Sequence, residues 1–220
     1  IFTLARELPF AGHPTLCTCH AWLEAGGRPK NEGIVVQECG AGLITIRNAE
    51  TGLSFAAPPL IRTGTPTEAE IARATQVLCI DREQIVDAQW VDNGPGWLAV
   101  MLASAEAVLA VEPLRHFTDR VEIGIVGAYS AGSDAAFELR AIFSGQNGEL
   151  IEDPVTGSLN ASIAQWLFSS GRAKDSYVAS QGTRLGRCGR VQLAQDSSGQ
   201  VWVGGRTKTL FASEHSQGRS

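Results

Sequence analysis

The sequence lacks any uninterrupted apolar run of the roughly 18 residues that a membrane-spanning helix needs, so it predicts no such helix. It also lacks a lysine and arginine cluster, because 18 basic residues are outnumbered by 23 acidic ones, for a formal net charge of -5. A nucleic-acid groove needs the opposite sign and a local basic patch, which excludes that class. The N-terminus has no initiator methionine, no basic segment and no long apolar segment. No signal peptide is recognised, and we expect a cytoplasmic protein.

Cysteine and histidine are also few. The five cysteines are an odd and scattered set, whereas a secreted disulfide framework is even in number and denser. The close pair Cys17 and Cys19 has no second pair at zinc-finger spacing, and the chain has only four histidines. We therefore expect reduced, structural thiols and no metal site.

The sequence does contain the patterns of a mixed α and β protein. With 220 residues, 44% of them apolar, it suits one large domain or two smaller ones. Helices are predicted at residues 14–25, 105–110 and 159–169, and a further helix begins at a capping box of Thr67 and Glu70. Strands are predicted at residues 34–37, 43–47, 53–55, 89–91, 97–101, 121–126 and 136–143.

An internal repeat divides the chain into two halves. Residues 9–13 (Pro-Phe-Ala-Gly-His) resemble residues 154–158 (Pro-Val-Thr-Gly-Ser), and in both halves a helix with a Trp-Leu pair and then Gly-led strands follow. The fold class predicted is α+β with two similar halves, residues 1–66 and 67–213, each a sheet around a central helix. Residues 214–220 form a polar, frayed tail. A short strand leads into each repeated loop, at residues 1–3 in the first half and 142–144 in the second. Residues 67–140 precede this strand in the second half, and no counterpart of them is present in the first half of this sequence. We therefore expect an incomplete first half.

Each repeated loop delivers a polar side chain and a glycine to the start of a helix. The first turn of a helix carries unsatisfied N–H groups and partial positive charge, and can hold a carboxylate. Glycines Gly12 and Gly157 would let a ligand approach the backbone. If a pseudo-two-fold axis relates the halves, then Asp153, His13 and Ser158 meet in one cleft and could act on a small anionic substrate.

Each of these side chains also has a purely structural interpretation. Asp153 precedes a proline and could be a turn residue, and Ser158 could be an N-cap. His13 could be a cap or a buried, hydrogen-bonded imidazole. The symmetric placement of the two loops favours a functional role for the group over these separate interpretations.

These same residues carry a family resemblance. Residues 7–16 (Glu-Leu-Pro-Phe-Ala-Gly-His-Pro-Thr-Leu) resemble the first signature of the phenazine-biosynthesis (PhzF-like) family, and residues 153–158 (Asp-Pro-Val-Thr-Gly-Ser) its second. Val203-Gly204-Gly205 is also similar. The resemblance implies a diaminopimelate-epimerase-like fold with the active site between its halves. It also implies a cofactor-independent isomerase that shifts a proton within a small carboxylate-bearing metabolite, with no metal and no organic cofactor.

The resemblance assigns roles to six residues. Asp153 matches the family's acid, while His13 and Ser158 match residues that bind and polarise the substrate. Gly12, Thr156 and Gly157 match the family's loops that hold the substrate carboxylate. The family's main proton carrier is a glutamate in an Asn-Leu-Ser-Glu-Thr-like motif upstream of the first signature, and this sequence has no such motif. We therefore expect this fragment by itself to lack full activity, and a homodimer is among the assemblies we consider.

A cysteine loop, Glu38-Cys39-Gly40-Ala41-Gly42, resembles that of two-thiol amino-acid epimerases. There the cysteine opens a helix, whereas here residues 43–46 continue as a strand. The positions equivalent to the catalytic thiols are Ala11 and Thr156, which cannot take a proton from carbon. Two hypotheses remain open: a PhzF-like isomerase, and a catalytically inactive small-molecule-binding or interaction relative that lacks the catalytic glutamate.

Overall fold

The computed structural model describes residues 1–2, 7–49 and 52–212. Its helices are α1 (Gly12–Glu24), α2 (Glu68–Leu78), α3 (Ala105–Ala110) and α4 (Gly157–Ser169), with 3-10 turns η1 (Arg82–Gln84) and η2 (Thr183–Leu185). The strands of the first half are β1 (Ile34–Cys39), β2 (Gly42–Ala49) and β3 (Gly52–Ala56). They are followed by β4 (Arg62–Gly64), β5 (Ile85–Asp92), β6 (Leu98–Leu102), β7 (Glu122–Ala128), β8 (Phe137–Ser144), β9 (Leu150–Asp153), β10 (Ser176–Gln181), β11 (Gly189–Gln195) and β12 (Val201–Gly205). The tail predicted at residues 214–220 lies outside the described residues.

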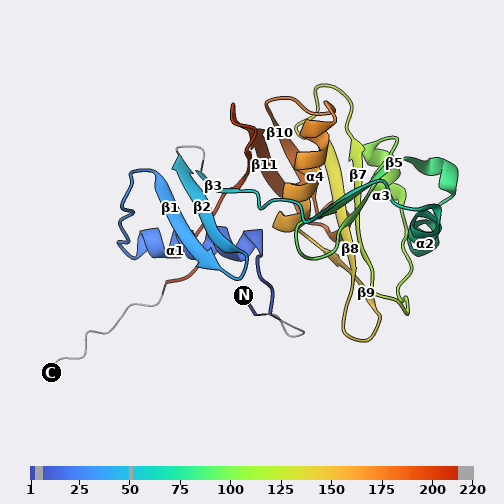
Figure 1. Ribbon diagram of the computed structural model, residues 1–220, viewed down its shortest axis with the longest axis horizontal. Coiled ribbons are helices and arrows are strands. Elements are labelled where there is room, and N and C mark those ends of the chain that lie inside the picture. The colour runs from blue at the N-terminus through green and yellow to red at the C-terminus, as the bar shows by residue number, and fades with distance from the viewer. Residues whose placement is uncertain (3–6, 50–51, 213–220) are drawn as a thin grey trace.

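One sheet runs through both halves of the chain. Its strand order is β1-β2-β3-β12-β11-β10-β8-β7-β6-β5-β4, and β9 pairs with β8. The three antiparallel strands that follow α1 (β1–β3) match the three that follow α4 (β10–β12), and the two sets join where β3 pairs antiparallel with β12. Figure 1 shows the first set with α1 as one lobe and α4 inside the curved sheet of the other. The predicted α+β fold of two similar halves is confirmed.

Helix α4 is the centre of the main core. Ten of its residues are buried, and the side chains of Leu159, Ile163 and Leu167 are fully enclosed. They pack with inward-facing residues of β11 and β12 such as Val191 and Val203. The same cluster continues into the first half through Phe10 and Phe55, whose rings meet edge to face at a centroid distance of 5.1 Å. This shared core fixes the two halves against each other.

The predicted sheet around a central helix in each half implies that both helices are largely buried, and α1 differs from this prediction. Only Gly12, Thr15, Leu16 and Cys19 of this helix are buried, and Trp22 is 41% exposed, whereas its repeat partner Trp166 is 6% exposed. The prediction is therefore wrong for α1. Strands β1 and β3 pack against one face of α1. The apolar composition of the helix does not determine which element, if any, packs against its opposite face.

The outer face of the second half is covered by α2 and α3. A second core cluster, which includes Ile71, Val108 and Ile125, lies beneath them. Helix α2 has the predicted capping box: the Glu70 N–H donates to Thr67 Oγ1 at 3.3 Å, and the Thr67 N–H donates to Glu70 Oε2 at 2.8 Å. No helix of the described residues combines the length and apolar composition needed to cross a bilayer. The domain boundary at residue 66 stays a prediction. Strand β4 lies before this residue and pairs with β5, which lies after it, so the sheet continues across the boundary.

Candidate active site

The N-termini of α1 and α4 meet at Gly12 and Gly157. A Cβ atom placed on Gly157 would lie 2.7 Å from the Cα of Gly12, and one on Gly12 would lie 2.9 Å from the Cα of Gly157 and 2.7 Å from the Phe55 ring. Non-bonded carbons ordinarily sit about 3.5–4.0 Å apart. The two helix starts therefore face each other. At this point they are in direct contact, so these glycines serve helix packing as well as any approach of a ligand.

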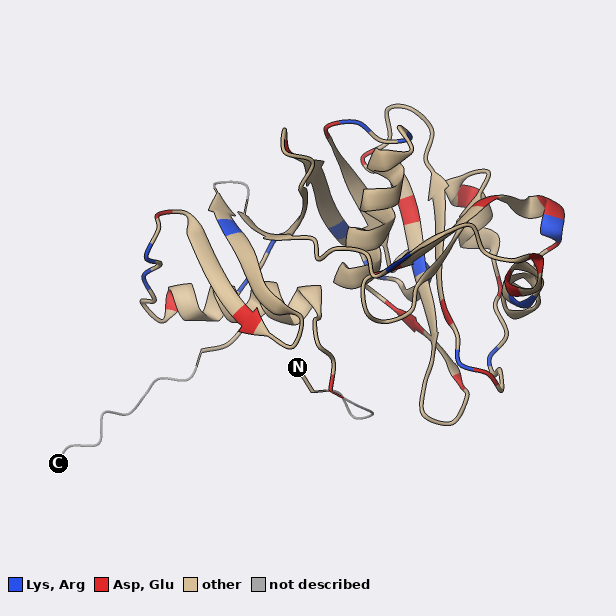
Figure 2. Cartoon of the chain, in the orientation of Figure 1, with Lys and Arg blue, Asp and Glu red and all other residues tan. Residues whose placement is uncertain are grey.

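Both facing helices lack the usual N-terminal stabilisation. Helix α1 begins after Ala11 and α4 after Thr156, neither side chain makes a capping hydrogen bond, and neither first turn holds an acidic residue. Helices α2 and α3 are capped by Thr67 and Ser104, and both carry acid in the first turn. Figure 2 shows few charged residues on α1 and α4 and many around α2. Two uncompensated helix starts side by side favour binding of an anion.

Strand β9, which ends at Asp153, is held against β8 by a buried ion pair between Glu152 and Arg140. Asp153 itself pairs with Ala141 of β8. Its neighbour Glu152 accepts hydrogen bonds from Arg140 Nη2 at 2.7 Å and Nε at 3.0 Å, and both side chains are largely buried. Arg140 also donates to the carbonyls of Val108 and Val111. A bidentate pair of this kind sets the position of β9 against β8.

The carboxyl group of Asp153 is half-buried, and within the described part of the chain it has one hydrogen-bond partner. Thr156 Oγ1 donates to its Oδ2 at 2.6 Å. Burial raises the pKa of Asp153 above its ordinary value, and this outweighs the Thr156 hydrogen bond and the charge of His13, which both lower it. A carboxyl group whose pKa is shifted toward neutrality is suited to accept and release a proton.

His13 lies in the first turn of α1 and its side chain is exposed. Its charge lowers the pKa of Asp153, so the two side chains, one from each half of the chain, are close enough to interact electrostatically. The structure thus brings together His13, Asp153, Thr156 and the two glycines. The interpretation of His13 as a buried imidazole is wrong.

Ser158 follows Gly157 on α4 and is buried. Its Oγ accepts a hydrogen bond from the indole Nε1 of Trp97 at 3.1 Å, and its carbonyl accepts one from Asn93 Nδ2 at 2.9 Å. An indole N–H can only donate, so the hydroxyl proton of Ser158 is free to point elsewhere. Ser158 makes no capping bond for α4, which begins after Thr156. The interpretation of Ser158 as a helix N-cap is therefore wrong.

The cysteine loop has a structural explanation. Cys39 ends β1, and the chain continues into β2 as a strand, as predicted. A Cβ on Gly40 would lie 2.9 Å from the Cα of Pro9, just as a Cβ on Gly182 would lie 2.6 Å from the carbonyl oxygen of Pro154. These glycines allow the sheet to pack against the two repeated loops.

Sequence reasoning missed four polar or aromatic residues that hold the site: Asn93, Trp97, Asn160 and Gln181. Asn93 and Trp97 support Ser158 from the β5–β6 connection. Gln181 is fully buried and hydrogen-bonds the Asp153–Thr156 loop. The sequence could have indicated Gln181, because it is a polar residue at the next core-facing position after Tyr177 and Ala179 in β10.

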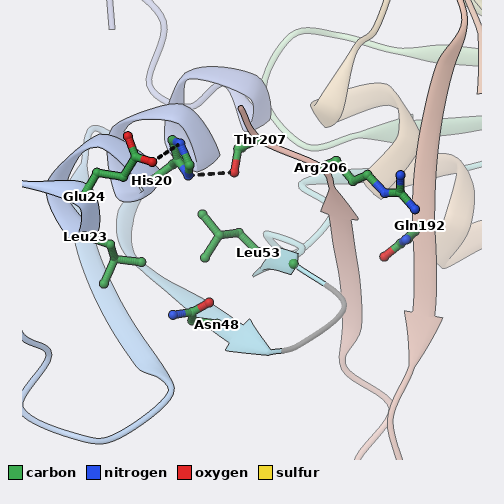
Figure 3. Close-up of a pocket in the computed structure, with 9 residues that line it drawn as sticks. His20, Leu23, Glu24, Asn48, Leu53, Gln192, Arg206 and Thr207 are labelled. Carbon is green, nitrogen blue, oxygen red and sulfur yellow. Dashed lines mark hydrogen bonds and ion pairs between the residues drawn. The ribbon is translucent and has the colours of Figure 1, made fainter. Parts of the chain in front are cut away.

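A cavity beside α1 lies away from these residues. It has a volume of about 720 Å³ and is lined from α1, β2, β3, β11 and the segment after β12. Figure 3 shows His20 there between Glu24 and Thr207. Both ring nitrogens of His20 are within 3.0 Å of threonine hydroxyls, those of Thr207 and Thr209. The cavity therefore reflects how the chain after β12 crosses α1, and none of the six predicted site residues lines it.

The shared sheet and the two repeated loops, which meet at the starts of α1 and α4, define an α+β protein of two similar halves. The family model described as Phenazine biosynthesis-like protein (PhzC-PhzF) matches residues 1–213, and the chain belongs to this family. Antisense-enhancing sequence 1 of Schizosaccharomyces pombe is 30% identical over 233 residues, covering 96% of this chain and 77% of that protein. An uncharacterized isomerase of Pasteurella multocida is 27% identical over 216 residues, covering 97% and 72%.

Solved structures share the fold. A phenazine biosynthesis protein of the PhzF family from Bacillus anthracis superposes with a TM-score of 0.72 at 18% identity, covering 92% of this chain and 74% of that one. A predicted epimerase from Pseudomonas aeruginosa gives a TM-score of 0.71 at 22% identity, covering 96% and 78%. At these identities the likeness establishes the architecture.

Proposed function

We propose that the chain is a cofactor-independent isomerase that moves a proton within a small carboxylate-bearing metabolite. The observation that carries this proposal is the contact of two uncapped helix starts at Gly12 and Gly157, with Asp153 and His13 beside them. Membership of the phenazine biosynthesis-like family and relatives named as an isomerase and a predicted epimerase support the reaction class.

In this proposal the helix starts hold the substrate carboxylate. The N–H groups of Gly12 and His13 on one side, and of Gly157 and Ser158 on the other, make no hydrogen bond to another described residue. They supply donors and partial positive charge from two directions. The free hydroxyl proton of Ser158 adds a further donor to the same anion or to a neighbouring carbonyl oxygen.

Asp153 then transfers the proton. Its ionised carboxylate takes a proton from a substrate carbon next to a polarising group, and the electron pair of the broken C–H bond moves into the substrate. The protonated carboxyl returns the proton at a second atom of the same molecule, so the product is an isomer. Because nothing is oxidised or reduced, positioned acids and bases suffice for this step. His13 stabilises the ionised form of Asp153 and the bound anion.

The proposal is tested by deuterium exchange. Purified protein in D2O is incubated with small carboxylic acids that carry an acidic C–H, and incorporation of deuterium is followed by proton NMR. We expect exchange with at least one of them, and Asp153→Asn should lower its rate by about 10²–10⁴-fold while substrate affinity stays within about tenfold. His13→Ala should weaken both binding and exchange.

The competing hypothesis, a non-catalytic binding relative, makes a different prediction. Carboxylates would then raise the melting temperature of the wild type, and no exchange above the Asp153→Asn background would occur. That combination of results would refute the isomerase.

A further inference from the structure

Gln181 uses all of its hydrogen-bonding capacity on the loop that carries Asp153 and on Asn160 in the first turns of α4. Its Oε1 accepts from the Thr156 N–H at 3.0 Å and from Asn160 Nδ2 at 2.7 Å. Its Nε2 donates to the Asp153 carbonyl oxygen and to Thr156 Oγ1, both at 3.0 Å. The side chain is 0% exposed. Turning the amide over would set its NH₂ against the Thr156 N–H and its oxygen against a carbonyl, so only this orientation fits.

The Gln181 amide also determines the direction of the next hydrogen bond. A threonine hydroxyl has one proton and two acceptor positions. Because Thr156 Oγ1 accepts from Gln181 Nε2, its own proton is left to donate to Asp153 Oδ2, which lies 2.6 Å away. Oδ1 of Asp153 receives no hydrogen bond from any residue within the described ranges, so it is the oxygen available to a substrate.

Among its described residues, the first half of the chain has no equivalent of this arrangement. Strand β10 ends at Gln181, paired with Gly189, and the matching strand β1 ends at Cys39, paired with Gly42. The Cys39 thiol contacts the Gly42 carbonyl oxygen at 3.5 Å and makes no hydrogen bond to the first repeated loop. The amide is therefore specific to the half that carries Asp153 and is not a general requirement of the repeated fold.

We propose that Gln181 is a positioning residue that fixes the Thr156 hydroxyl as a donor to Asp153, so that one carboxylate oxygen is held and the other faces the substrate. This inference rests on the proposed function, because it assigns the proton transfer to Asp153. Gln181 does not touch the substrate and acts through Thr156.

The test measures the pKa of Asp153 directly. The carboxyl carbon is titrated by carbon-13 NMR in the full 220-residue chain, and its resonance is assigned with Asp153→Asn. Thr156→Val and Gln181→Met should each move the pKa of Asp153 upward, because each removes stabilisation of the ionised form. In the double variant the pKa should rise no further than in the larger single variant, as expected for residues acting in series. In the exchange assay each single variant should lose up to about 100-fold in rate, with substrate affinity changing less.

Gln165→Met is the matched control. Gln165 is a half-buried amide on α4, and it donates to the carbonyls of Pro58 and Ala161 rather than to the Asp153 loop. Its substitution should leave the pKa of Asp153 unchanged. If Gln181→Met does not fold, Gln181→Asn replaces it, since the shorter side chain cannot reach Thr156 Oγ1 and keeps a polar group in place.

Two results would overturn the assignment: an unchanged pKa of Asp153 in the Gln181 variant while Thr156→Val raises it, or shifts that add in the double variant. A failure of the proposed function gives a different result. The wild type would then exchange no deuterium with any carboxylate, while the NMR shifts still followed the expected pattern.

Discussion

Replacing Gly157 with alanine should damage the site far more than its size suggests. The new methyl carbon would lie 2.7 Å from the Cα of Gly12 and 3.2 and 3.3 Å from the backbone N and C of the same residue. All three atoms are backbone, so no side chain can move aside. To restore a normal carbon contact of about 3.5–4.0 Å, the starts of α1 and α4 must separate by roughly 1 Å.

Two opposing terms set the stability of Gly157→Ala. Alanine is favoured over glycine in a helix by up to about 1 kcal/mol, since it restricts the unfolded chain. Overpacking of this kind costs about 1–3 kcal/mol. The net effect on the free energy of unfolding, measured by urea denaturation, is a loss of up to about 2 kcal/mol when the full alanine gain applies. A displacement of 1 Å at a catalytic site can cost about 10²-fold in rate, so the exchange assay should respond much more strongly.

Gly205→Ala is the matched control for this prediction. Gly205 ends β12, has no left-handed backbone conformation, and a Cβ there meets nothing within 4 Å. The control should leave stability and exchange rate close to wild type. If Gly157→Ala behaved like Gly205→Ala in both assays, the contact between the two helix starts would not constrain the site.

Two further substitutions test the core and the Asp153 environment. Trp166→Ala should cost about 3–5 kcal/mol in the free energy of unfolding by leaving a cavity. Trp22 is at the repeat-matched position but is 41% exposed, so Trp22→Ala should cost clearly less. Equal losses would contradict the unequal burial of the two helices. Burial raises the pKa of Asp153 in the folded protein, so the fold binds this proton more tightly than the unfolded chain and loses stability as pH rises through the raised value. Asp153→Asn should therefore melt at a higher temperature than wild type at pH 7, and the difference should vanish below about pH 4. A difference in melting temperature that stays constant with pH would refute the raised pKa of Asp153.

The repeat in the sequence predicted the architecture because both halves obey the same local rules. The helix at residues 105–110 and the capping box at Thr67 and Glu70 were predicted from local chemistry and are confirmed. Helices α1 and α4 begin earlier than predicted, at Gly12 and Gly157. Glycine has a poor helix propensity, so local patterns assign it to the loop, and only the contact between the two helices explains its place in the first turn.

The interactions that hold the candidate site were less accessible from sequence. The residues supplied by the two repeated loops were found, because their spacing is short and repeated. Gln181 and Trp97 contact these loops from strands far along the chain, and such long-range pairs depend on register. The burial of α1 was predicted wrongly for the same reason, since apolar composition shows that a helix has something to bury and does not identify the surface that covers it.

In the proposed mechanism, the differences between the matched positions determine the direction of proton transfer. At the position where the second loop has Asp153, the first loop has Leu8, and where β10 ends in Gln181, β1 ends in Cys39. A symmetric pair of helix starts can hold an anion but cannot tell one end of a substrate from the other. In the proposed mechanism, a single carboxylate, held by one amide through one hydroxyl, makes one face of the bound anion the face at which protons move. On this proposal the shared backbone plan supplies binding, and the unequal side chains of the two halves supply orientation.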